Sequence, residues 1–216
     1  DGAIVRTIGR IGFPAMLTSF FLNLGFYLIN KETEKYGTVV LNGQGIASNI
    51  TAVCFNLPSS FSSAVTTMVS MNIGAGNPLK AKRSCIAGTI ISAATAIVVI
   101  AIIVPLSPYL TILFTREKDV LDIANHALHI YTYSVIGFGV CMTIQGAFIG
   151  LGRTRVPLVL GILRIWFLRY IFILATERVL GFYSVFWGNL FSNYTAAFIS
   201  ILLIARMKWV SVIEKN

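Results

Sequence analysis

The stretch from Gly43 to Arg83 constrains the fold of this chain more than any other part of the sequence. It has no charged residue before Lys80, and it ends in a Gly-Ala-Gly-Asn-Pro turn followed by a basic cluster. An uncharged apolar run of more than about 18 residues is typical of a transmembrane helix. Lys and Arg gathered just beyond such a run mark its cytoplasmic end. The stretch therefore predicts a membrane-spanning helix whose carboxyl end faces the cytoplasm.

This predicted helix also carries polar residues along its length. Asn49 and Asn56 are seven positions apart, so they share a helix face, and Ser60, Ser63 and Thr67 continue near that stripe. Such residues are costly against lipid and are expected to face other helices or a water-filled cavity. The pattern leaves two readings open: contacts between helices, or the lining of a path for a solute.

The composition supports a membrane protein with several spans. Hydrophobic residues make up 56% of the chain and charged residues 12%, about half the charge expected of a soluble domain. The formal net charge is +9, but the basic residues lie between apolar runs and form no stripe with interleaved aromatic residues, which excludes nucleic-acid binding. The three cysteines lack metal-ligand spacing and are predicted to be small buried hydrophobes.

Apolar runs separated by turns predict a single lobe of six transmembrane helices over residues 1–216. Pro58 is expected to kink the second span, and Pro105 and Pro108 are expected to end the third. Charged connectors are expected at residues 31–42 and 115–122. The six predicted spans cover about residues 11–30, 46–73, 84–104, 123–150, 156–175 and 182–205.

The basic residues divide unequally between the two sides of this arrangement. The side holding both chain ends collects Arg6, Arg10, Lys80, Lys82, Arg83, Arg153, Arg155, Arg206, Lys208 and Lys215, and the other side Lys31, Lys35, Arg116, Lys118 and Arg178. Lys and Arg are enriched in cytoplasmic loops. The sequence therefore predicts a multi-pass protein of the plasma (inner) membrane with both ends of this chain in the cytoplasm.

Inside the predicted spans the charged residues are basic, because all eight Asp and Glu fall in connectors or tails. Arg164 lies near the middle of the fifth span, where a charge must reach water or a partner. Arg169 is nearer the outer end of the span and is expected to snorkel. Five residues correspond to about 500° of α-helical rotation, so the two arginines are expected on different faces and not as one clamp.

Candidate residues for a solute cavity are Asn23, Asn49, Asn56, Gln145 and Arg164. His126 and His129 form a helical pair whose position favours a structural role over a metal site. Gly146 and Gly150 match a helix-packing motif. Two Gly-x-Gly turns, at Gly74 and Gly150, are expected to end helices. The sequence has no catalytic constellation, so we expect neither an enzyme, nor a cofactor, nor a metal centre.

Several of these motifs together resemble the carboxy-terminal half of the multidrug and toxic compound extrusion (MATE) family. They are Pro14, the Gly43–Ala47 segment, Leu57-Pro58, the Gly-Ala-Gly-Asn turn at Gly74 and the segment Gly146–Arg155. The resemblance covers nearly the whole chain. It implies an all-α membrane protein, one six-helix lobe of a twelve-helix antiporter that exports cationic and amphipathic compounds using a proton or sodium gradient.

The resemblance also implies a partner outside this chain, the amino-terminal six-helix lobe, and the absence of an initiator Met fits a chain that is part of a longer protein. One branch of the family has acidic coupling residues where this chain has Leu22 and Phe138, so this chain is similar to the other branch. Two alternatives stay open: a flippase for lipid-linked oligosaccharides of the same superfamily, and a structural membrane subunit without transport.

Overall fold

The computed structural model of the chain describes residues 20–207 and Trp209. Within that part the fold is entirely helical, which confirms the predicted fold class. The elements are a helical segment at residues 20–34, α2 (Thr38–Gly74), α3 (Pro78–Ile112), α4 (Lys118–Gly150), α5 (Arg155–Ile162), η1 (Leu163–Tyr170), α6 (Ile171–Leu180) and α7 (Tyr183–Ala205). Pro14 and the first part of the first predicted span lie outside the described residues.

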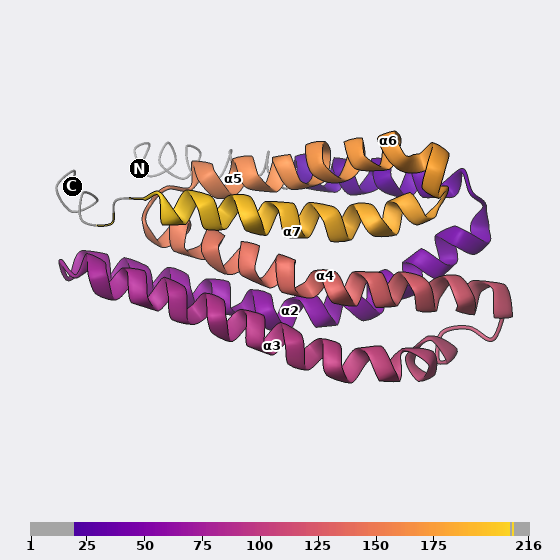
Figure 1. Cartoon of the computed structure of the whole chain (residues 1–216), viewed down its shortest axis with the longest axis horizontal. Helices are drawn as coiled ribbons and strands as arrows, with labels where there is room; N and C mark the ends of the chain where they lie inside the picture. Colours follow the sequence, from indigo (N-terminus) through magenta and orange to yellow (C-terminus); the bar gives the residue numbers. More distant parts are fainter. Residues whose placement is uncertain (1–19, 208, 210–216) are drawn as a thin grey trace, which may run out of the picture.

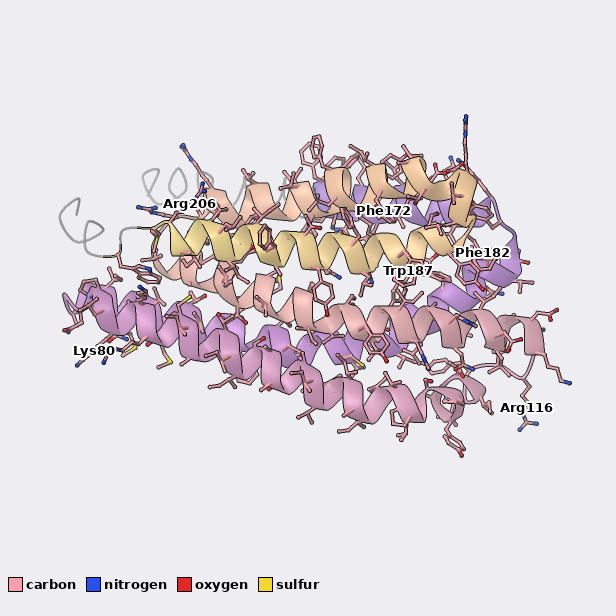
Figure 2. The ribbon with its side chains drawn as sticks, in the orientation of Figure 1. Lys80, Arg116, Phe172, Phe182, Trp187 and Arg206 are labelled. Carbon is pink, nitrogen blue, oxygen red and sulfur yellow. The ribbon has the colours of Figure 1, made fainter. Side chains whose placement is uncertain are left out.

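The helices run along the long axis of the molecule, and successive connections lie at opposite ends (Figure 1). α5, η1 and α6 follow one another without a break and form a single rod. The helix α4 packs against α2, α3 and α7, and its buried residues extend along its whole length. It therefore forms the centre of the bundle. Lys80 and Arg206 lie at one end of the bundle, and Arg116 lies at the other (Figure 2).

The connectors are shorter than the sequence predicted. α3 continues through Pro105 and Pro108 to Ile112, so the prediction that these prolines end the helix was wrong. Proline is tolerated inside membrane helices where neighbouring groups and local adjustments satisfy the freed backbone. Lys31, Glu32 and Glu34 are helical, and α4 begins at Lys118 rather than near residue 123. The acidic residues in the described part therefore lie in the end turns of helices as well as in loops.

Among the described residues, four helices are long and apolar enough to cross a membrane: Pro78–Ile112, Lys118–Gly150, Arg155–Leu180 and Tyr183–Ala205. The helix α2 is not one of them, although it has no charged residue. Its Ser, Thr and Asn residues lower its hydropathy below that of an ordinary span. Several of these hydroxyls donate to a carbonyl one turn back in the same helix, as Thr67 does to Ser63, which reduces their cost in apolar surroundings.

The two Gly-x-Gly turns end their helices as predicted. After α2, Gly76 has a φ of 73°, its N–H donates to the carbonyl of Ile73 at 3.0 Å, and Asn77 donates to Asn72 at 2.8 Å. After α4, Gly152 has a φ of 72°, and Arg153 N–H donates to Phe148 at 2.9 Å. These are the hydrogen bonds of the Schellman motif. The motif requires one residue in the left-handed backbone conformation, which glycine adopts without strain.

The Gly146–Gly150 motif holds α4 against α2. Thr66 Oγ1 donates to the carbonyl of Gly146 at 2.9 Å. A Cβ at Gly146 would collide with the carbonyl oxygen of Ser62, and one at Gly150 would lie 2.6 Å from that of Thr66. The predicted helix-packing role of this motif is therefore confirmed. The three cysteines are buried and free, also as predicted.

Replacing Gly146 with alanine is expected to lower the thermal stability of the protein, because the backbone of α2 has to move away. Overpacking of this kind costs about 1–3 kcal/mol. Thermal unfolding in detergent, followed by circular dichroism, measures the effect. Gly161→Ala is the matched control, since a Cβ there meets only Leu22 Cδ2 at 3.8 Å. Equal melting temperatures for the two variants would contradict the packing role of Gly146.

Candidate functional site: a polar cavity inside the bundle

A partly open cavity of about 690 Å³ lies between the helices of the bundle. Residues from the helical segment 20–34, α2, α4, η1 and α7 line it. Its lining is partly aromatic, including Phe26, Phe55 and Phe138, and partly polar. Small-molecule sites are usually clefts of about 300–1,000 Å³ with an apolar lining and a few placed polar groups. The size and lining of this cavity therefore suit a small organic solute.

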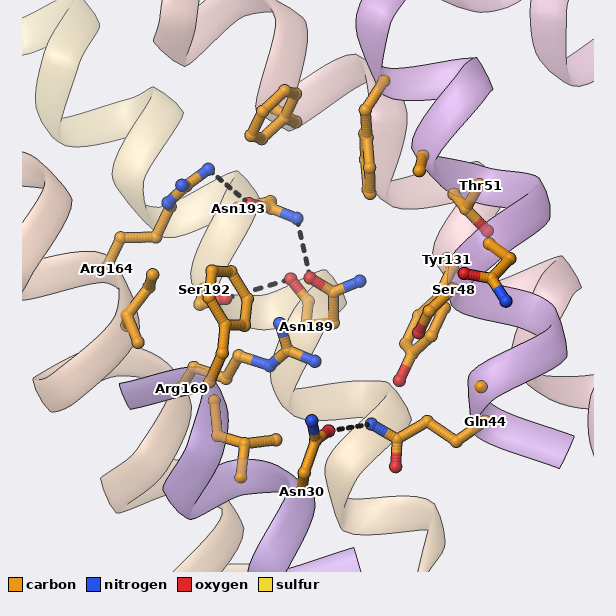
Figure 3. A pocket seen from close by; sticks show the side chains of 18 of the residues that line it. Asn30, Gln44, Ser48, Thr51, Tyr131, Arg164, Arg169, Asn189, Ser192 and Asn193 are labelled. Carbon is orange, nitrogen blue, oxygen red and sulfur yellow. Dashed lines mark hydrogen bonds between the residues drawn. The ribbon is translucent and has the colours of Figure 1, made fainter. Parts of the chain in front are cut away.

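Two arginines from one rod reach the cavity, Arg164 and Arg169. Arg164 Nη1 donates to Asn193 Oδ1 at 3.2 Å, and its guanidinium lies over the Phe138 ring at 4.9 Å from the centroid. Arg169 lies over the Phe26 ring at 5.9 Å. The Nε atoms of both arginines are buried and have no hydrogen-bond partner among the described residues. In Figure 3 the Arg164 side chain points toward Asn193 and that of Arg169 toward Asn189.

The expectation that these two arginines point to different faces was wrong. Residues 163–170 form a π-helix, whose hydrogen bonds link each residue to the fifth one along the chain. This wider turn brings positions five apart toward the same side of the rod. Arg169 therefore faces the cavity together with Arg164 instead of snorkelling to the membrane surface. π-Helical turns occur frequently at functional sites.

An amide cluster on α7 supports the arginine pair. Asn193 is 3% exposed, and its Nδ2 donates to Asn189 Oδ1 at 3.0 Å and to Ser134 Oγ on α4 at 3.3 Å. Both amides project from one face of α7 because they are four residues apart. The cluster thus joins η1, α4 and α7 through one chain of hydrogen bonds that ends at Arg164. A second amide pair, Gln44 Nε2 to Asn30 Oδ1 at 3.3 Å, lies at another wall of the cavity.

The structure brings together two of the five predicted cavity residues. Asn49 and Arg164 line the cavity. Asn56 is exposed on α2 beyond the lining, where its carbonyl accepts from Ser60 Oγ at 2.7 Å. Asn23 is exposed on the first helical segment and is not part of the lining. Gln145 is buried on α4, where its Nε2 donates to Cys141 Sγ at 3.1 Å, as a contact within the helix rather than a cavity group.

Sequence reasoning missed several cavity residues, chiefly Arg169, Asn189, Asn193 and Tyr131. The four-residue spacing of Asn189 and Asn193 places the two amides on one face of the last predicted span, but nothing in the sequence selected that face as the cavity wall. Tyr131 offers only a single hydroxyl in an apolar run, and in the part of the chain that the structure describes this buried hydroxyl has no hydrogen-bond partner. His129 Nε2 lies 2.6 Å from Ser107 Oγ, between α3 and α4. No group of His, Cys, Asp and Glu in the described residues is arranged to hold a metal ion.

An Arg164→Cys variant, made in a background without the native cysteines, is expected to react with a water-soluble thiol reagent. The reason is that position 164 opens to the cavity, whereas Leu160, one turn earlier on the same rod, is 1% exposed and does not line it. Leu160→Cys is the matched control and is expected to be protected. Labelling followed by mass spectrometry measures both. Protection of position 164 to the same degree as position 160 would show that no water reaches the cavity.

Long apolar helices around a cavity with charged and amide groups are features that membrane transporters typically have. Comparisons with known proteins give the family. The MatE family model matches residues 14–174. The chain belongs to the MatE family of transporters.

Individual relatives agree with this assignment. The chain is 32% identical over 117 residues to multidrug and toxin extrusion protein 2 of Oryctolagus cuniculus, covering 54% of this chain and 20% of that protein. It is 30% identical over 147 residues to the multidrug resistance protein MdtK of Cronobacter sakazakii (strain ATCC BAA-894), covering 65% of this chain and 32% of that protein.

Among solved structures, an outward-facing MATE family multidrug resistance transporter of the MOP superfamily superposes with a TM-score of 0.87 at 20% identity, over 100% of this chain and 49% of that one. This superposition shows that the two chains share a fold. The chain therefore spans about half the length of that transporter, and its matched segments make up a third or less of each of the two curated relatives.

Proposed function

We propose that this chain is the carboxy-terminal six-helix lobe of a secondary active multidrug efflux antiporter. The lobe exports amphipathic or cationic compounds by alternating access, driven by a proton or sodium gradient. The observation that carries the proposal is the cavity of about 690 Å³ with aromatic and polar walls, in a chain of the MatE family. Intramembrane charged and amide groups that face such a cavity typically mark a substrate pathway.

The proposal includes an amino-terminal lobe as partner, packed against the polar face of α2. Asn49, Asn56, Ser60, Ser63 and Thr67 are all exposed on this helix. A stripe of polar groups is costly against lipid, so a second lobe with water between the two is its favourable environment. This chain covers 49% of the solved relative, and the other half of that relative's length is enough for a second lobe.

The proposed orientation places both chain ends in the cytoplasm of the plasma (inner) membrane. Lys80 and Arg206 lie at the same end of the bundle (Figure 2). Arg153 lies in the connection between α4 and α5 at that end, and Lys82, Arg83 and Arg155 lie in the first turns of α3 and α5 there (Figure 1). The acidic residues that the structure describes lie in the helix ends and the loop at the opposite end of the bundle. An excess of Lys and Arg marks cytoplasmic loops, which supports this orientation.

A drug-susceptibility assay tests the proposed function. The protein expressed from its complete gene in an efflux-deficient host is expected to raise the inhibitory concentration of several amphipathic compounds, with empty vector as control. Proton and sodium ionophores, applied separately, then identify the coupling ion as the one whose dissipation stops efflux. Unchanged susceptibility to every compound, with the protein present in the membrane, would contradict efflux.

The flippase alternative gains support from one observation, the second arginine in the cavity. Arg169 together with Arg164 makes the lining more cationic than the sequence alone indicated. A cationic floor suits the phosphates of a lipid-linked oligosaccharide. Accumulation of such a lipid precursor after depletion of the protein, with unchanged drug susceptibility, is the result that would favour this function.

A further inference from the structure

The charge of the cavity is one-sided. Among the residues with a described position, the lining contains two arginines and no Asp or Glu. Within the described residues the structure has a single ion pair, between Lys35 and Glu32 at the end of the first helical segment, so neither arginine is neutralised by a carboxylate of that part of the chain. Guanidinium groups remain protonated in proteins. Two positive charges in surroundings of low dielectric repel a bound cation and attract an anion.

The contacts of the arginines leave hydrogen-bond donors free. Arg164 uses Nη1 for Asn193, and its guanidinium carbon lies 4.9 Å from the centroid of the Phe138 ring. Arg169 is likewise placed over a ring, that of Phe26. Among the described residues the two guanidinium groups make one hydrogen bond, from Arg164 to Asn193, so most of their N–H donors have no partner there. A guanidinium edge matches the geometry of a carboxylate, phosphate or sulfonate.

We infer that this cavity binds the oxyanion of an amphipathic organic anion, held by Arg164 and Arg169. This inference rests on the proposed function and specifies its substrate class. The π-helical turn places both guanidinium groups on one side of the cavity (Figure 3). The aromatic side chains of Phe26, Phe55 and Phe138 supply the apolar surface for the rest of the solute. The structure thus favours a solute with a negative group, in contrast to the cationic compounds that the resemblance alone implies.

Matched probes test the inference on the protein expressed from its complete gene. Naphthalene-2-sulfonate and 2-naphthylmethylammonium share the same rings and differ in charge. Isothermal titration of the detergent-purified protein is expected to show binding of the sulfonate and little binding of the ammonium. Arg164→Gln and Arg169→Gln are each expected to weaken sulfonate binding about 10- to 100-fold, as expected for loss of hydrogen bonds from a charged donor.

Three further variants distinguish an effect of charge on sulfonate binding from a loss of folded protein. Arg178→Gln removes an exposed arginine of α6 outside the cavity and is expected to leave sulfonate binding unchanged. Arg164→Lys keeps the charge without the planar edge and is expected to bind with intermediate affinity. Asn193→Asp nearly keeps the shape of the side chain but sets a carboxylate beside Arg164. It is expected to weaken sulfonate binding and strengthen ammonium binding even if a glutamine variant fails to fold.

Proteoliposome transport of the same probes separates this inference from efflux itself. Sulfonate binding without transport of either probe would support the anion site and contradict efflux. Transport of the ammonium with no binding of the sulfonate would support efflux and overturn the anion site, as would glutamine variants that bind the sulfonate like the wild type. Geranyl phosphate as competitor distinguishes the source of the oxyanion: tighter binding than the sulfonate indicates a lipid phosphate, and weaker binding indicates a soluble organic anion.

Discussion

Replacing Gly137 with valine is expected to prevent α4 and α7 from meeting and to remove most of the folded protein from the membrane. A Cβ at this position would lie 2.9 Å from the carbonyl carbon of Asn193, 3.0 Å from its oxygen and 3.0 Å from Tyr194 N. All three are backbone atoms, which cannot rotate away as a flexible side chain does. Overpacking typically costs about 1–3 kcal/mol and more where the neighbour cannot yield. Because the same contact positions Asn193, the cavity is expected to be lost as well.

Fluorescence-detected size-exclusion chromatography of a tagged protein measures the amount of folded Gly137→Val protein. Gly74→Val is the matched control, since a Cβ added to this glycine at the end of α2 would have no atom within 4 Å. The control is expected to elute like the wild type. A symmetrical peak of wild-type height for Gly137→Val would show that α4 and α7 are not packed through this glycine.

Replacing Asn193 with leucine is expected to destabilise the protein by about 3 kcal/mol, because it removes the side-chain acceptor of Arg164. The same substitution removes the bonds from Asn193 to Asn189 and Ser134. The buried groups left behind lose these partners, and among the described residues Arg164 keeps its contact with the Phe138 ring. Thermal unfolding in detergent is the measurement. Asn49→Leu, at an exposed amide of the same cavity, is the control with an expected change below about 0.5 kcal/mol.

The double variant Asn193→Leu with Arg164→Met distinguishes an orphaned charge from a simple loss of packing. Removing both members of a buried polar pair is often close to neutral, whereas removing one partner is strongly destabilising. The double variant is therefore expected to recover most of the lost stability. Additive losses from the two substitutions would mean that Arg164 and Asn193 are not energetically coupled.

Local sequence patterns predicted the features that depend on neighbouring residues. The Gly-x-Gly turns at Gly76 and Gly152 and the packing of Gly146 against α2 follow from short motifs whose geometry is formed within one or two helical turns. The prolines of α3 show the limit of that reasoning. Their effect on a helix depends on how its surroundings satisfy the backbone, and that information lies in the neighbouring helices.

The candidate site was only partly predictable for the same reason. Asn49 and Arg164 stood out because a polar or charged residue inside an apolar run is costly wherever it points. Asn23 and Gln145 carry the same local signal but lie away from the cavity, since which face of a helix meets the cavity is set by packing. Asn193 became a central residue only through its contacts with Arg164 and Ser134 on other helices.

The sequence by itself determined that this protein is a helical membrane protein with polar groups enclosed between its helices. Length, hydropathy and charge placement are properties of each segment on its own, so they can be assessed without the tertiary structure. Only the tertiary structure decided that Arg164 and Arg169 face one cavity. The π-helical turn between them changes the rotation per residue, and the sequence of residues 163–170 gives no local sign of that change. The charge of the cavity, and with it the expected class of solute, is therefore a property of the packed bundle.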